Sequence, residues 1–246
     1  MRFFNVVSVL LAGATATSAA GASCAPTASD AQVLQFAWGL SDFIGGYYNS
    51  TVNSTFAGSS NATILAYKRI LFGLEKENTL GSEAIEEVGA KAQGFTEPQC
   101  TFQFPQVNTT QAWAQWAYRF ESTVTGAFIG LAGFTQSPEV SFLMARLAAS
   151  HNAHATLIGS RVNSTLFAQN TTSLVGAYEP DQILAKTNQT GSLGLYLGDC
   201  LSAPSSPCGT LKVGPLIATP SGTPSSSAVA SSTSMVASSS AAAKRF

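Results

Sequence analysis

Apolar residues recur at three- and four-residue spacing through four long segments of the chain. This spacing places side chains on one face of a helix. It predicts four long helices, at about residues 30–48, 62–90, 109–134 and 138–161. Pro138 suits the first turn of the fourth of these, and a shorter helix is expected at about residues 180–186, where it caps the bundle. The chain therefore falls in the all-α class, with its apolar stripes buried against one another.

The fourth long segment holds both histidines of the sequence, His151 and His154. Residues three apart on a helix share a face, and here that face is the apolar stripe that contains Leu147 and Ile158. Two imidazoles in a helical core are either hydrogen-bonded core residues or metal ligands. The spacing alone gives these two interpretations about equal weight.

Polar residues also interrupt the apolar stripes of the other three long segments. Ser41 lies in the first stripe, Glu75 and Asn78 stand three apart in the second, and Glu121 falls at the inner boundary of the third. A buried carboxylate without a partner costs several kcal/mol. We therefore expect Glu121 to bind something, while Glu75 either does the same or reaches water at the edge of its stripe.

The two ends of the chain differ in composition from its centre. Residues 1–22 have a basic residue, an apolar run and small residues in the order of a secretory signal peptide. Residues 30–199 form the helical domain, and residues 203–246 form a Ser/Thr/Pro/Ala-rich tail that is expected to be disordered. Such a tail suits association with a cell wall.

Export is also indicated by seven Asn-x-Ser/Thr sequons, which begin at Asn49, Asn53, Asn61, Asn108, Asn163, Asn170 and Asn188. No segment after the signal reaches about 18 uncharged apolar residues, so no transmembrane helix is expected. The formal net charge is -1, and no basic cluster supplies the footprint that nucleic-acid binding needs. The sequence therefore predicts a secreted, extracellular glycoprotein that does not bind nucleic acid.

Four cysteines fit two disulfides in an oxidising compartment, and three pairings are open. Cys200 could pair with the nearby Cys208, which would leave Cys24 with Cys100. Alternatively, the two C-terminal cysteines pair with the two N-terminal ones. The long-range arrangement is slightly favoured, because closing longer loops stabilises a fold more.

The order of inward polar residues matches a known template. Ferritin-like carboxylate bundles carry one glutamate on each of two helices and a Glu-x-x-His motif on each of the other two. In this chain the same order is Ser41, Glu75-x-x-Asn78, Glu121 and His151-x-x-His154. The runs VLQFAWGLSDFIGGYY, CTFQFP and WAQWAYRFESTVTGAFIGLA resemble one branch, the secreted ferritin-like proteins of ascomycete fungi of the stress-response or late sexual-development type. This resemblance covers about residues 30–162 and implies an up-and-down four-helix bundle with a long crossover.

Three positions depart from the pattern of that family. Ser41 stands where the family has a carboxylate, Asn78 where it has a histidine, and His151 where it has a glutamate. A pair of irons needs about four carboxylates to balance its charge, so a working di-iron oxidase site is not expected.

Two functions remain open from the sequence. The first is binding of one transition metal ion (Fe, Zn or Cu) through four residues, His151, His154, Glu121 and Glu75. The alternative is a metal-free structural or cell-surface glycoprotein whose metal site has decayed. Neither the spacing nor the resemblance identifies a substrate or a reaction.

Overall fold

The computed structural model describes residues 24–52, 62–162 and 176–209. Four long helices and one short helix lie in these ranges: α1 (Ala28–Val52), α2 (Ala62–Gly89), α3 (Thr110–Ala132), α4 (Pro138–Val162) and α5 (Pro180–Leu184). The described residues contain no β-strand. The predicted all-α class is therefore confirmed, and α1 continues to Val52, one turn beyond its predicted end.

Some predictions fall outside the described part of the chain. These are the signal peptide, most of the tail, and the sequons at Asn53, Asn61, Asn163 and Asn170. Among the described helices, none combines the length and apolarity that a membrane span requires.

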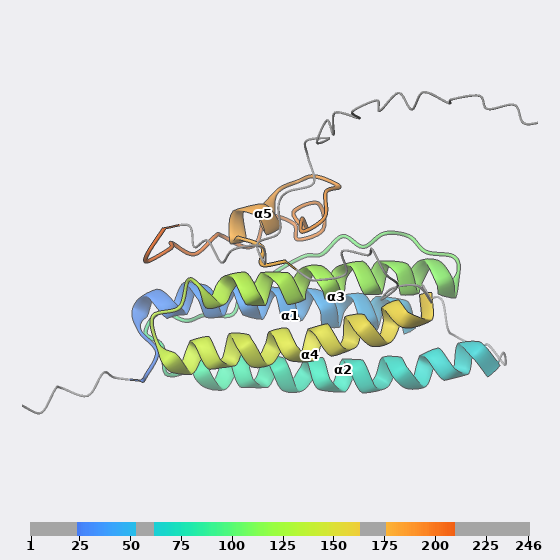
Figure 1. The fold of residues 1–246 in the computed structure, drawn as a ribbon, viewed down its shortest axis with the longest axis horizontal. Coiled ribbons are helices and arrows are strands. Elements are labelled where there is room, and N and C mark those ends of the chain that lie inside the picture. The colour runs from blue at the N-terminus through green and yellow to red at the C-terminus, as the bar shows by residue number, and fades with distance from the viewer. Residues whose placement is uncertain (1–23, 53–61, 163–175, 210–246) are drawn as a thin grey trace, which may run out of the picture.

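The four long helices form a bundle (Figure 1). α1 and α2 make one antiparallel pair, and α3 and α4 make the other. The connection between the pairs, residues 90–109, runs along the outside of the bundle, so that α2 and α3 point in the same direction. This is the bundle with a long crossover that the resemblance implies.

α1 is the most deeply buried helix, because other helices and the crossover cover most of its circumference. Its fully enclosed side chains include Val33, Leu34, Ala37, Leu40, Phe43, Ile44 and Tyr48. Two crossover residues, Phe102 and Phe104, pack on Phe43 with ring centroids 5.5 and 5.4 Å away. Aromatic packing of this kind fixes the crossover on the bundle. Ser41, which the sequence places in the apolar stripe of this helix, is buried as well.

Asp30 joins the start of α1 to the turn between α3 and α4. Its carboxylate accepts hydrogen bonds from the backbone N–H of Thr27 at 2.8 Å and of Gln136 at 2.7 Å. Burial raises the pKa of Asp30, but these backbone donors lower it by more, so the pKa lies below its ordinary value. The ionised carboxylate thus holds one end of the bundle together.

The segment that leads into α5 lies directly on α3. The Tyr178 N–H donates to the Gly126 carbonyl at 2.9 Å. One turn further along α3, a Cβ on Gly130 would stand 2.0 Å from the Tyr178 carbonyl oxygen. Only a glycine allows this approach, so α3 is shaped to receive the C-terminal segment.

A disulfide joins the crossover to the C-terminal segment. Cys100 and Cys200 are bonded, and they are 100 residues apart in sequence. The Gln103 N–H donates to the Tyr196 carbonyl at 2.9 Å, which brings the same two segments together. The slightly favoured long-range pairing is therefore found for these two cysteines. Cys24 and Cys208 are both exposed, and a second disulfide stays a prediction.

Candidate metal centre

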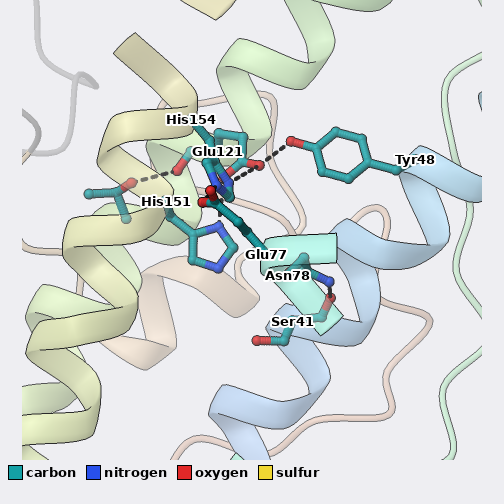
Figure 2. Close-up of polar contacts among 8 residues, drawn as sticks. Ser41, Tyr48, Glu77, Asn78, Glu121, His151 and His154 are labelled. Carbon is teal, nitrogen blue, oxygen red and sulfur yellow. Dashed lines mark hydrogen bonds and ion pairs between the residues drawn. The ribbon is translucent and has the colours of Figure 1, made fainter. Parts of the chain in front are cut away.

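One carboxylate and two imidazoles meet in the interior of the bundle (Figure 2). Glu121 comes from α3, and His151 and His154 come from α4. One oxygen of Glu121 lies 2.6 Å from His151 Nδ1, and the other lies 3.3 Å from His154 Nδ1. Glu121 is fully buried, and the two histidines are 2% and 3% exposed. The structure therefore brings together three of the four predicted ligands.

The fourth predicted ligand, Glu75, does not join this cluster. It lies partly exposed on α2, whereas Glu77 of the same helix places a carboxylate oxygen 2.7 Å from His154 Nε2. Glu77 is two residues further along, which is about 200° around a helix, so it faces α4. The sequence signal for this face is a glycine four residues after Glu77: in the structure, a Cβ on Gly81 would stand 3.1 Å from the Leu147 side chain of α4.

Tyr48 of α1 also contacts the cluster, through its hydroxyl group. Its hydroxyl donates a hydrogen bond to the Glu121 oxygen that faces His154. The ring is fully buried. Burial raises the pKa of Tyr48 well above its ordinary value, and the nearby Glu121 charge raises it further. The hydroxyl therefore stays protonated and fixes the orientation of the carboxylate.

Helical packing also fixes the imidazoles. The Phe128 ring lies 5.1 Å from the His151 ring, and the two imidazole rings are 5.6 Å apart with an angle of 69° between their planes. The Thr125 hydroxyl donates to the Glu121 backbone carbonyl at 2.8 Å within α3. The three candidate ligands are thus held in place by their surroundings before any ion arrives.

Ser41 and Asn78 lie beside the cluster but add no charge to it (Figure 2). The Asn78 side-chain amide donates to the Ser41 backbone carbonyl at 3.0 Å. Ser41 Oγ and Asn78 Oδ1 are buried, and neither has a hydrogen-bond partner among the residues that the structure describes. Ser41 and Asn78 therefore do not supply the carboxylate and the imidazole that the family pattern has at these two positions.

The charges of the cluster depend strongly on one another. Burial raises the pKa of Glu121, but the charge and hydrogen bonds of His151 and His154 lower it by more, so this carboxyl is ionised at neutral pH. Burial lowers the pKa of His154, but Glu121 and Glu77 on its two ring nitrogens raise it by more. An ionised, buried carboxylate between two imidazoles is a chemically suitable cation site.

The spacing of the ligand atoms suits a single ion. One ligand atom from each of Glu121, His151 and His154 lies within 4.8 Å of the other two. Ligands around one ion at bonds of about 2.1 Å stand at most about 4.2 Å apart, so only a small contraction is needed.

Comparison with known proteins agrees with the fold. The family model described as the ferritin-like domain matches residues 29–164, which is more than half of the chain. The chain therefore belongs to the ferritin-like domain family. Searches of curated proteins and of solved structures find no match.

Proposed function

We propose that this protein binds one divalent transition-metal ion per chain through Glu121, His151 and His154. The observation that carries the proposal is the convergence of three fully enclosed ligand groups from α3 and α4. Ionised carboxylates are almost never fully buried unless they are paired or coordinate a metal. Glu77 adds a second carboxylate at the outer side of His154.

The charges favour one ion over two. With both imidazoles neutral, Glu121 and Glu77 balance one divalent cation. A second divalent ion would leave about two uncompensated positive charges in a low-dielectric core, which costs many kcal/mol. Ser41 and Asn78 are neutral and cannot offset that charge. The residues present therefore do not fit the two-metal centre of typical ferritin-like carboxylate proteins.

Two imidazoles and one carboxylate suit Fe(II), Zn(II) or Cu(II). An ion held by so few protein ligands keeps open positions, where it could polarise water or exchange electrons. The protein's own groups would position the ion: Glu121 is oriented by Tyr48, and His154 is held between Glu121 and Glu77.

We further propose that the protein is a secreted glycoprotein, of the ascomycete stress-response or sexual-development type. Its N-terminal signal-like sequence supports export, and the tail after residue 203 supports a place in the cell wall. The sequon asparagines within the described ranges, Asn49, Asn108 and Asn188, are all exposed and could accept glycans.

One observation favours the metal-free alternative. The carboxylate and the imidazoles already hydrogen-bond to one another, and Tyr48 and Glu77 complete the network. A fully satisfied buried network can simply stabilise and specify a core. Metal uptake by the purified protein decides between the two functions.

The test is calorimetric titration of chelator-treated protein with Zn²⁺ at pH 7.5. We expect saturation at about one ion per chain, and a loss of at least about 100-fold in affinity in the His151→Ala/His154→Ala double variant. Affinity should fall as the pH falls through the raised pKa of His154, because protons then compete for its ring nitrogens. Saturation at two ions, or affinity unchanged in the double variant, would contradict the proposal.

Glu77 and Glu75 provide a matched pair of variants for the same titration. Glu77→Gln should weaken Zn²⁺ binding about tenfold or more, because Glu77 contacts His154. Glu75→Gln removes the same charge from the same helix and should leave affinity nearly unchanged. A larger loss in Glu75→Gln would mean that the sequence-based choice of ligand was the right one.

A further inference from the structure

A groove of about 550 Å³ lies between α2 and α4 and reaches His151. Binding sites for small molecules have volumes of about 300–1,000 Å³. The two helices run antiparallel, with Glu77 beside His154 and Lys91 beside Glu139. The groove therefore extends from the candidate metal centre toward the end of the bundle where α4 begins.

The walls of the groove are largely apolar. They are formed by Leu80, Ala84 and Val88 of α2 and by Phe142, Leu143 and Leu147 of α4. Leu80 is 56% exposed and Phe142 is 69% exposed, so two large apolar side chains stand in solvent at this groove. An apolar molecule lying against these side chains would remove part of that surface from water, which is favourable.

The charged groups of the groove leave one cation without a counter-ion. Glu77 pairs with His154 at 2.7 Å, and Glu139 pairs with Lys91 at 2.5 Å. Arg146 also lines the groove, and within the described ranges its guanidinium has no ion-pair partner. Both acidic groups of the groove therefore have a partner of their own, and the Arg146 guanidinium is left to pair with an anionic group of a ligand.

The position of Arg146 determines where the anionic group of a ligand would bind in the groove. From Glu139 to His151, α4 rises roughly 18 Å, and Arg146 stands near the middle of that length. A guanidinium pairs best with a planar anion such as a carboxylate. A molecule with an apolar body and one carboxylate therefore matches both the walls and the charge.

We propose that the α2–α4 groove binds a small apolar carboxylate, with its body against the apolar walls of the groove and its anionic group paired with Arg146. This site does not require a metal ion for binding. A molecule in it lies next to His151, so when the neighbouring centre holds an ion, the groove brings an organic ligand to that ion.

The test uses the full chain in excess chelator, with decanoate, decanol and decylamine as probes in separate calorimetric titrations. Decanoate should bind saturably at one molecule per chain, about fivefold to tenfold tighter than decanol, and decylamine should bind weakest. Because no metal is present, failure of this experiment is distinct from failure of the proposed metal binding.

Two variants, each with a matched control, test whether decanoate binds in this groove. Ala84→Trp fills the groove from a partly exposed position and should abolish decanoate binding, whereas Ala145→Trp on the solvent side of α4 should not. Arg146→Gln should reduce decanoate affinity to that of decanol and leave decanol unchanged. Arg161→Gln, an exposed arginine of α4 outside the groove, serves as its control.

Three outcomes would overturn the proposal. The first is absence of saturable decanoate binding, and the second is equal binding by the wild type and Ala84→Trp. The third is sedimentation showing a dimer that Ala84→Trp dissociates, since the groove would then be occupied by a second copy of the chain. Arg146→Gln changes a surface residue and keeps the test decisive if Ala84→Trp does not fold.

Discussion

Replacing Glu121 by glutamine is expected to lower Zn²⁺ affinity by more than about 100-fold, the largest loss for any single substitution at the centre. Glutamine keeps the size of the side chain and can still accept a hydrogen bond from Tyr48, but it removes the charge that both imidazoles face. An ion would then be left with neutral ligands and with Glu77, which is largely exposed at the outer side of His154. Calorimetry of the metal-free variant gives the measurement.

The control for this substitution is Glu139→Gln, which removes one carboxylate at the far end of the groove. Glu139 pairs with Lys91 at the surface, and exposed pairs of this kind contribute little to stability. Its Zn²⁺ affinity should equal that of the wild type. A Glu121→Gln protein that retains affinity within threefold would show that this carboxylate is not a ligand.

Removal of the Cys100–Cys200 disulfide is expected to have the largest effect on stability. The bond closes a loop of 100 residues, which in the chain-entropy model stabilises the fold by about 4–5 kcal/mol. The Cys100→Ala/Cys200→Ala variant should therefore unfold at much lower urea concentration, with a steeper dependence on urea because its unfolded chain is no longer cross-linked and exposes more surface.

Two further observations would check that the disulfide acts through the unfolded chain. Far-ultraviolet circular dichroism of the folded variant should match the wild type, since the helices do not depend on the bond. Cys208→Ser should change the unfolding free energy by less than the double variant does, unless Cys208 forms the second disulfide that the sequence predicts. A double variant as stable as the wild type would refute the argument from loop closure.

The helices could be predicted from sequence because their apolar spacing is local information. Burial of Ser41, His151 and His154 followed from the same periodicity, since each lies in line with an apolar stripe. The sequence places Glu121 at the inner boundary of its stripe, where a carboxylate needs a partner, and in the structure it is fully buried. Its convergence with the histidines followed from the order of polar residues in the family template.

The role of Glu77 could not be obtained from the stripe of α2. Asn78 turns to α1, where it binds the Ser41 carbonyl, while its neighbour Glu77 turns to α4. Which flank of a helix meets which partner depends on how the helices cross, and periodicity does not specify that. Disulfide pairing is non-local in the same way, because the contact of the crossover with the C-terminal segment brings Cys100 to Cys200.

The most direct test of the metal site is its location in crystals of the Zn²⁺-loaded protein. Diffraction data collected on both sides of the zinc absorption edge give an anomalous difference map that marks the ion itself. We expect one strong peak per chain, enclosed by the Glu121 carboxylate and the imidazoles of His151 and His154. Two peaks in this cluster, or an empty cluster with zinc bound elsewhere on the chain, would contradict it.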